Sequence, residues 1–204
     1  MEKEKLLQTL SKQGITEETI QAIAKVPREL FIGNNTPETA YKNIALPIDY
    51  DQTISQPYTV AYMIDLLELS PGKKVLELGG GTGYSAAVMW EKMKRQGELY
   101  SLELIPGLQK TGKQNLAKAG YKEIHLICKD GKKGYPEHAP YDRVVIAAAV
   151  STLAKEITEQ LKEEGILVFP QQTSQNACIM TKIKKKKQGF ETSTHGYFAF
   201  VPFV

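Results

Sequence analysis

A short apolar segment that runs into a cluster of glycines constrains this chain more than any other feature. Its sequence is Val75-Leu-Glu-Leu-Gly-Gly-Gly-Thr-Gly-Tyr84, and a helical pattern of apolar residues follows it. This order predicts a buried strand, a tight turn and a helix. In an open α/β sheet such a turn lies at the carboxyl edge, where ligands bind. Gly79, Gly81 and Gly83 would let the backbone approach a ligand closely, although any sharp strand-to-helix turn can use glycine.

The rest of the chain alternates between strand and helix patterns. Strand candidates lie at 99–102, 124–128, 144–148 and 166–169, and helical patterns lie near 58–69, 107–118 and 152–163. Uninterrupted apolar strands between helices predict a doubly wound α/β fold, with a mostly parallel sheet and helices on both faces. Residues 177–183 and 196–203 predict an antiparallel hairpin that closes the sheet. The lysines 184–187 between them would form a solvated turn that blunts the sheet edge.

Acidic residues lie near the ends of three predicted strands. Glu77 precedes the glycines, where it would repel a pyrophosphate but suit an ammonium group, and Tyr84 stands where a dinucleotide fingerprint requires its third glycine. Glu103 ends the second strand and could accept hydrogen bonds from ribose hydroxyls; the alternative is a solvated strand end. Asp130 and Gly131 follow the third strand, where an acid could meet an adenine amino group; the alternative is a plain turn. Together these residues predict an S-adenosylmethionine site.

The first 57 residues have a different pattern. Residues 1–26 predict two short helices, whereas residues 33–57 hold three prolines and little periodicity, which predicts an irregular loop. A loop of that length in a compact domain is usually functional. We therefore expect one methyltransferase domain over residues 1–204. Residues 1–57 would form a helical cap and substrate loop, and residues 58–204 the cofactor-binding α/β core.

Five segments resemble the protein-L-isoaspartate O-methyltransferases, in the same order along nearly the whole chain. The most specific is Gln52-Thr-Ile-Ser-Gln-Pro57. The others are Val26-Pro-Arg-Glu29, Ala45-Leu-Pro-Ile48, Tyr141-Asp-Arg143 and Phe200-Val-Pro202. The resemblance implies a Rossmann-like methyltransferase fold and S-adenosylmethionine as cofactor. It also implies methyl esterification of the α-carboxylate of L-isoaspartyl residues in damaged proteins, which is a repair reaction.

The resemblance also implies roles for single residues. Ser55 matches the active-site serine, and Thr53, Ile54 and Gln56 lie in the segment that contacts the substrate. The family's cofactor-binding positions match Gly79, Gly81, Gly83, Glu103, Asp130 and Gly131. A carboxylate is already an anion at neutral pH, so Ser55 would position it by hydrogen bonding and no strong base is needed. The alternative for Ser55 is the N-cap of the helix that follows, and both roles could coexist.

The sequence departs from the family pattern at a few positions. Asp51 replaces a usual glycine and would place a carboxylate near the presumed substrate entrance, where Lys42 or Arg28 could neutralise it. Ala147 replaces a frequent threonine, and Gln171-Gln172 stand where Val-Gly is commoner. These departures leave two alternatives open. One is a related methyltransferase acting on another carboxylate, in a small molecule or modified peptide, or on RNA. The other is a cofactor-binding protein without turnover.

The composition of the chain argues against nucleic-acid, metal and membrane binding. Lys and Arg number 26 against 23 acidic residues, a net charge of +3, which is too small an excess to indicate nucleic-acid binding. Cys128 and Cys178 have no second Cys or His at metal-ligand spacing, so neither a metal site nor a disulfide is predicted. No apolar run approaches the roughly 20 residues of a membrane-spanning helix. We therefore expect a cytoplasmic monomer that acts on peptides and proteins, away from membranes.

Overall fold

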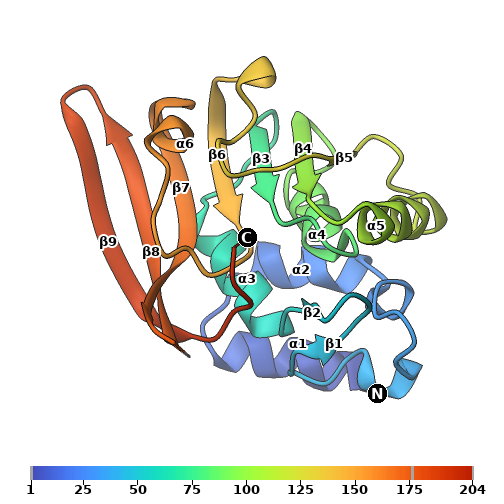
Figure 1. Cartoon of the computed structure of the whole chain (residues 1–204). Helices are drawn as coiled ribbons and strands as arrows, with labels where there is room; N and C mark the ends of the chain where they lie inside the picture. Colours follow the sequence, from blue (N-terminus) through green and yellow to red (C-terminus); the bar gives the residue numbers. More distant parts are fainter. Residues whose placement is uncertain (1, 176, 204) are drawn as a thin grey trace.

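A seven-stranded sheet forms the centre of the computed structural model, which describes residues 2–175 and 177–203 (Figure 1). The strand order is β5-β4-β3-β6-β7-β8-β9; the first five strands are parallel, and β8 and β9 are antiparallel. The strands are β3 (Lys74–Leu78), β4 (Glu98–Glu103), β5 (His125–Cys128), β6 (Tyr141–Ile146), β7 (Leu161–Ser174), β8 (Ala177–Lys186) and β9 (Gly189–Phe198). The predicted mostly parallel sheet with an antiparallel C-terminal hairpin is confirmed.

Helices cover the two faces of the sheet unequally. The helices are α1 (Glu2–Lys12), α2 (Glu17–Lys25), α3 (Pro57–Leu66), α4 (Tyr84–Lys92), α5 (Pro106–Lys118) and α6 (Lys155–Glu159). One apolar core joins residues of α1 to α5 with Val75 of β3, whereas Leu76 and Leu78 belong to a second core that includes Ile157 of α6. Side chains alternate along a strand, so Glu77 faces the same side as Val75, toward α3 and α4.

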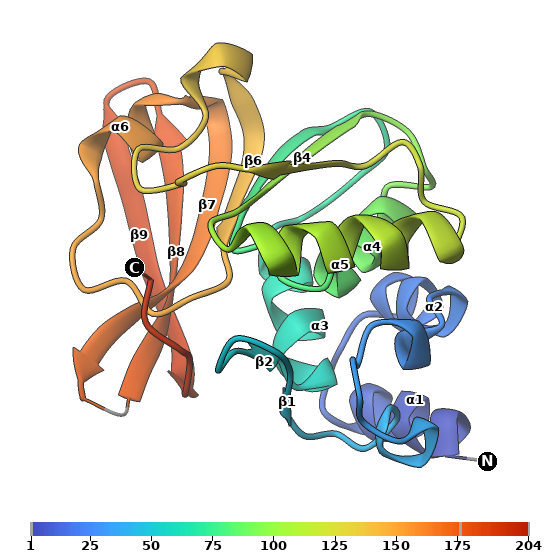
Figure 2. The ribbon, with the colours of Figure 1, turned by 45° about the vertical axis from the view of Figure 1, so that its right-hand side comes forward.

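The N-terminal helices are tied to the α/β core through α3. Figure 2 shows α1 and α2 next to α3 and α4, on one side of the sheet. The Asp65 carboxylate of α3 accepts hydrogen bonds from the Thr16 backbone N–H at 2.8 Å and from the Thr16 and Thr19 hydroxyls. These bonds satisfy donors at the start of α2.

Nowhere in the described residues is a helix long and apolar enough to cross a bilayer.

The segment between α2 and α3 is mostly irregular, as predicted. It contains two short 3₁₀ helices, η1 (Arg28–Leu30) and η2 (Pro37–Thr39). It also forms a two-residue antiparallel hairpin, β1 (Leu46–Pro47) and β2 (Thr53–Ile54). A third 3₁₀ helix, η3 (Pro136–His138), precedes β6.

Two predictions about the C-terminal half were wrong in extent. The helix expected over 152–163 is limited to α6, because Leu161 already pairs with Tyr141 at the start of β7. The second strand of the hairpin is β9, not residues 196–203. Residues 199–203 instead return to the carboxyl edge of the sheet, where Ala149 donates to the Val201 carbonyl at 2.8 Å and accepts from the Phe203 N–H at 2.9 Å.

The lysine run was also misplaced. Lys184 and Lys186 lie on β8, one strand inside the sheet edge, and only Lys187 of the run lies in the turn. Both strand lysines pair with the Glu164 carboxylate, at 3.0 Å and 3.2 Å. Two of the four lysines are therefore engaged in cross-strand ion pairs, and most of the run lies on a strand and not in a solvated turn.

Candidate active site

The glycine turn joins β3 to α4 at the carboxyl edge of the sheet. Its first two N–H groups, of Gly79 and Gly80, both donate to the Leu102 carbonyl at 2.9 Å, which ties the turn to β4. Gly79, Gly81 and Gly83 all have positive φ angles, of 91°, 53° and 87°. Such angles are accessible to glycine at little cost and strained for other residues.

The glycines of the turn differ in what surrounds them. A Cβ on Gly81 would point into open space, whereas a Cβ on Gly83 would lie 2.8 Å from the Leu116 side chain. Gly81 therefore leaves room for a ligand at the surface of the turn. Gly83 is required for close packing of the turn against α5, so the structure gives it a packing role in addition to any contact with a cofactor.

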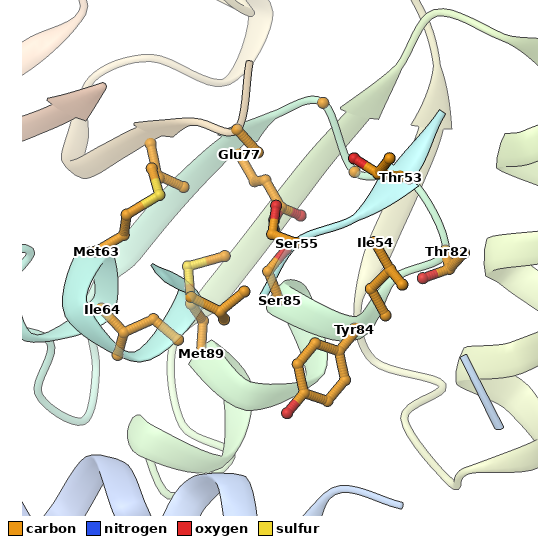
Figure 3. Close-up of a pocket in the computed structure, with 16 residues that line it drawn as sticks. Thr53, Ile54, Ser55, Met63, Ile64, Glu77, Thr82, Tyr84, Ser85 and Met89 are labelled. Carbon is orange, nitrogen blue, oxygen red and sulfur yellow. Dashed lines mark hydrogen bonds between the residues drawn. The ribbon is translucent and has the colours of Figure 1, made fainter. Parts of the chain in front are cut away.

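Three adjoining cavities open around the turn. The first, of about 590 Å³, lies between Glu77, the glycines and the 53–55 segment (Figure 3). The second, of about 690 Å³, extends from Gly79 and Gly81 past Glu103 and Gly131 to α5 and to residues 201–203. The third, of about 880 Å³, lies between Ser55, Gln56, α3 and residues 197–201. Thr53 and Ala147 line all three cavities, so the cavities meet at these two residues.

Glu77 is a fully buried carboxyl group at the first cavity. Ser101 Oγ donates to it at 2.6 Å, and Ser85 Oγ of α4 donates to its other oxygen. Figure 3 shows the Glu77 side chain directed toward Ser85. Burial raises the pKa of Glu77 to about 7, and the two serine hydrogen bonds oppose this shift. A cation bound in this cavity would favour the ionised form.

Glu103, at the end of β4, binds two backbone amides. Its Oε2 accepts from Gly81 N at 2.8 Å and its Oε1 accepts from Ile105 N at 2.9 Å. Only 6% of the residue is exposed, and it lines the second cavity. The carboxylate thus fixes the glycine turn from the neighbouring strand while it faces the place proposed for a ribose.

Asp130 and Gly131 occupy different positions. The Asp130 carboxylate is exposed and accepts from Lys132 N at 2.9 Å, which closes a turn. Asp130 is not one of the described residues that line the three cavities, whereas Gly131 lines the second cavity. The plain-turn interpretation describes Asp130 in this structure, and its contact with adenine stays a prediction.

The segment that carries Ser55 leads from β2 into α3. Thr53, Ile54 and Ser55 line the first cavity, and Ser55 also lines the third, together with Gln56. The N-cap of α3 is Gln56, and its side chain makes no capping hydrogen bond. The N-cap interpretation of Ser55 was therefore wrong, because the helix begins one residue too late for it.

Residues distant in sequence hold this segment in place. Arg28 Nη2 donates to the Ser55 carbonyl at 2.9 Å. Asn43 binds twice: its carbonyl accepts from Gln56 Nε2 at 2.9 Å, and its side-chain oxygen accepts from Tyr58 N at 3.0 Å. The backbone around Ser55 is thus fixed by two residues of the irregular region.

Asp51 lies at the tip of the β1–β2 hairpin. Both Tyr50 and Asp51 have positive φ angles, of 63° and 55°, and both are exposed. Asp51 is not one of the described residues that line the three cavities. Arg28, one of the two cations considered as partners of Asp51, is fully buried, and its guanidinium donates to the Ser55 carbonyl instead.

The other two departures from the family pattern lie apart. Ala147 follows β6 and its N–H donates to the Leu78 carbonyl at 2.8 Å, so its methyl group stands beside the glycine turn. Gln171 and Gln172 are exposed on β7. Of these positions, Ala147 alone is placed to affect a bound ligand.

Sequence reasoning missed part of the wall of the first cavity. Four apolar residues of α3 and α4 line it: Val60, Met63, Ile64 and Met89. Their helical spacing is typical of core residues, and all four are buried. The same spacing carries no sign of whether a buried side chain faces another side chain or a cavity.

Known proteins share the fold and the sequence. A family model described as protein-L-isoaspartate(D-aspartate) O-methyltransferase (PCMT) matches residues 1–204. The chain belongs to this family. The protein-L-isoaspartate O-methyltransferase of Methanococcoides burtonii is 38% identical over 199 residues, which cover 98% of each chain. That of Methanothrix thermoacetophila is 43% identical over 183 residues, covering 89% of this chain and 87% of the relative.

Solved structures of the family agree. One protein-L-isoaspartate O-methyltransferase superposes with a TM-score of 0.89 at 30% identity, over 98% of this chain and 65% of the other. A Plasmodium falciparum protein described as a putative protein-L-isoaspartate O-methyltransferase beta-aspartate methyltransferase (PCMT), solved with S-adenosyl-L-homocysteine, has a TM-score of 0.85 over 98% of this chain and 97% of the other. At 22% identity, the second supports the fold alone.

Proposed function

We propose that this chain uses S-adenosylmethionine to methylate the α-carboxylate of L-isoaspartyl residues in damaged proteins. The observation that carries the proposal is the position of the Thr53–Gln56 segment. It separates the cavity at the glycine turn from the cavity that opens toward residues 197–201, and Ser55 faces both. A segment in that position can touch a cofactor on one side and a peptide on the other.

The residues around the glycine turn fit the cofactor. The open space at Gly81 would admit a ligand against the backbone, and two cavities extend from it in different directions. Glu77 would face the ammonium group, Glu103 the ribose, and Gly131 with Leu108 would wall the end taken by the adenine. When bound, S-adenosylmethionine supplies a methyl group on a sulfonium, which is electrophilic without further activation.

The chain's own residues would orient the nucleophile and exclude water. The Ser55 hydroxyl would donate a hydrogen bond to the substrate carboxylate and hold one oxygen toward the first cavity. The apolar walls of α3 and α4 would exclude water from that oxygen. No general base is required, and in the described residues no histidine lines any of the three cavities.

The substrate would be a flexible peptide segment. The third cavity is walled by Tyr58 of α3 and by Phe198 and Phe200 near the end of the chain, which suit an extended backbone with apolar neighbours. One chain supplies every residue of the proposed site, so a monomer would suffice. Residues 1–57 would form a helical cap and the substrate loop, and residues 58–204 the cofactor-binding core, which also supplies the aromatic wall of the third cavity. Two unpaired cysteines, Cys128 and Cys178, favour a cytoplasmic location.

The test compares two peptides that differ in one linkage. The protein is incubated with methyl-labelled cofactor and with matched isoaspartyl and aspartyl peptides. We expect label in the isoaspartyl peptide only. Methylation of neither peptide, with S-adenosylhomocysteine still bound in calorimetry, would favour another carboxylate substrate or a protein without turnover.

A further inference from the structure

Arg28 is a buried cation with few partners. Its side chain is fully buried in η1, and Nη2 donates to the Ser55 carbonyl at 2.9 Å. Within the described part of the chain, its Nε and Nη1 atoms have no hydrogen-bond partner. The guanidinium also lies over the ring of Tyr84, with Cζ 4.5 Å from the ring centroid. One hydrogen bond and one ring contact are thus its main polar interactions.

Folding stability does not account for this arrangement. Removing a guanidinium from water is costly, and the cost is recovered only when most of its donors are paired. An apolar side chain of similar length at this position would avoid that cost. Arg28 therefore requires an explanation other than stability.

The two residues that Arg28 contacts come from different elements that line the first cavity. Ser55 lies in the substrate segment, and Tyr84 is the first residue of α4, directly after the glycine turn. Figure 3 shows both residues at the cavity. A planar guanidinium that binds one and stacks on the other fixes their separation more rigidly than apolar packing would.

We propose that Arg28 is a positioning residue, which holds the Ser55 backbone in register with the cofactor turn. It acts through Ser55 and touches neither the cofactor nor the substrate. This inference rests on the proposed function, since it gives a catalytic purpose to a contact with Ser55.

Arg143 offers a matched control. It is also buried, at 8% exposed, and donates to the backbone carbonyls of Leu67, Glu68 and Asp142. Among the described residues, none of these carbonyls belongs to a residue that lines the three cavities. Arg143 links β6 to the end of α3, which is a structural role.

The experiment compares Arg28→Met with Arg143→Met. The readouts are hydrogen exchange over residues 52–57, melting temperature, affinity for S-adenosylhomocysteine, and kcat and KM for an isoaspartyl peptide. For Arg28→Met we expect faster hydrogen exchange over residues 52–57 and an unchanged or higher melting temperature. We also expect kcat to fall about tenfold. For Arg143→Met we expect a lower melting temperature, with exchange over 52–57 and kcat unchanged.

Two further variants test the route of the effect. Arg28→Lys keeps a donor but loses the planar group, so its kcat should lie between those of Arg28→Met and the wild type. In a Ser55→Ala background, Arg28→Met should lower kcat by no more than about twofold, because the two residues act together.

Unchanged hydrogen exchange over residues 52–57 in Arg28→Met would overturn the inference. It would also be overturned if Arg28→Met were destabilised or unfolded while Arg28→Lys kept the wild-type kcat. A wild-type protein inactive on isoaspartyl peptides would count against the proposed function instead. The exchange measurement would still decide whether Arg28 fixes the segment.

Discussion

The glycine turn and the Ser55 segment face the same cavity but are held in different ways. The turn is fixed by its own neighbours: Leu102 and Glu103, on the adjacent strand, bind the N–H groups of Gly79, Gly80 and Gly81. The Ser55 segment is fixed by Arg28 and Asn43, which come from an irregular region. The cofactor side is therefore built into the sheet, whereas the substrate side depends on contacts between residues distant in sequence.

Substitution in the glycine turn should have the largest effect. Gly81→Ala adds a Cβ where a ligand would lie, and we expect S-adenosylhomocysteine to bind at least about 100-fold more weakly, while the fold persists. Gly83→Ala has the same backbone strain, but its Cβ would lie 2.8 Å from Leu116. It should therefore lower the free energy of unfolding, by roughly 1–3 kcal/mol.

Calorimetry and urea denaturation on both variants separate ligand contact from packing. A different result would reverse the roles assigned to the two glycines. In that case Gly81→Ala would bind S-adenosylhomocysteine normally, whereas Gly83→Ala would lose affinity for it without losing stability.

On the substrate side, Ser55→Ala should lower turnover and spare cofactor binding. A hydrogen bond to a charged group contributes about 1.5–3 kcal/mol, so kcat should fall roughly tenfold to 100-fold. The affinity for S-adenosylhomocysteine should stay within about twofold. An equal loss in kcat and in that affinity would show that Ser55 serves the cofactor side as well as the substrate side.

The pKa of Glu77 gives a pH dependence on the cofactor side. The folded protein keeps this carboxyl protonated up to about pH 7, whereas its ordinary value is 4.5. The folded state therefore binds more protons in that window, so the free energy of unfolding falls as pH rises from about 4.5 to about 7. Glu77→Gln should flatten this slope in urea titrations at several pH values.

Cofactor binding should change with pH in the opposite sense. An ammonium group beside Glu77 favours the ionised form, so affinity for S-adenosylhomocysteine should rise several-fold as pH increases through about 7. Calorimetry in buffers of different ionisation enthalpy would detect the proton released on binding below that pH. A pH-independent affinity would place the ammonium group elsewhere.

The smallest effect is expected at the hairpin tip. Asp51→Gly relieves a left-handed backbone conformation but makes the unfolded chain more flexible, so the free energy of unfolding should change by less than about 1 kcal/mol. The KM for an isoaspartyl peptide should be unchanged, because Asp51 is not among the residues that line the three cavities. Asp51→Asn serves as the control that removes charge alone. A KM that falls in both variants at low salt would place Asp51 on the path of the substrate.

Much of the α/β core could be predicted from the sequence because several of its strands contain short apolar runs. The Val144–Val145 and Ile166–Val168 runs mark β6 and β7 directly. β9 could not be found in this way. Residues 191–195 are polar because this edge strand is exposed, so their sequence lacks the apolar pattern of a buried strand.

The candidate site shows the same division. Glu103 and the glycines follow from a local motif, since the turn and strand β4 lie side by side in every sheet of this kind. The exposed position of Asp130 and the burial of Arg28 could not be predicted, because each depends on how distant segments pack. An arginine in a short Val-Pro-Arg-Glu segment gives no sign that its side chain lies under Ser55.

The repair outcome is the most direct test of the central claim, that Ser55 presents an isoaspartyl carboxylate to the cofactor. The protein, S-adenosylmethionine and an isoaspartyl peptide are incubated, and chromatography with mass spectrometry follows the methyl ester, the succinimide and the aspartyl peptide. We predict that the isoaspartyl peptide declines while the succinimide and aspartyl forms appear, and that Ser55→Ala slows this conversion. A methyl group on any other position, or an isoaspartyl peptide that persists beside consumed cofactor, would contradict the account.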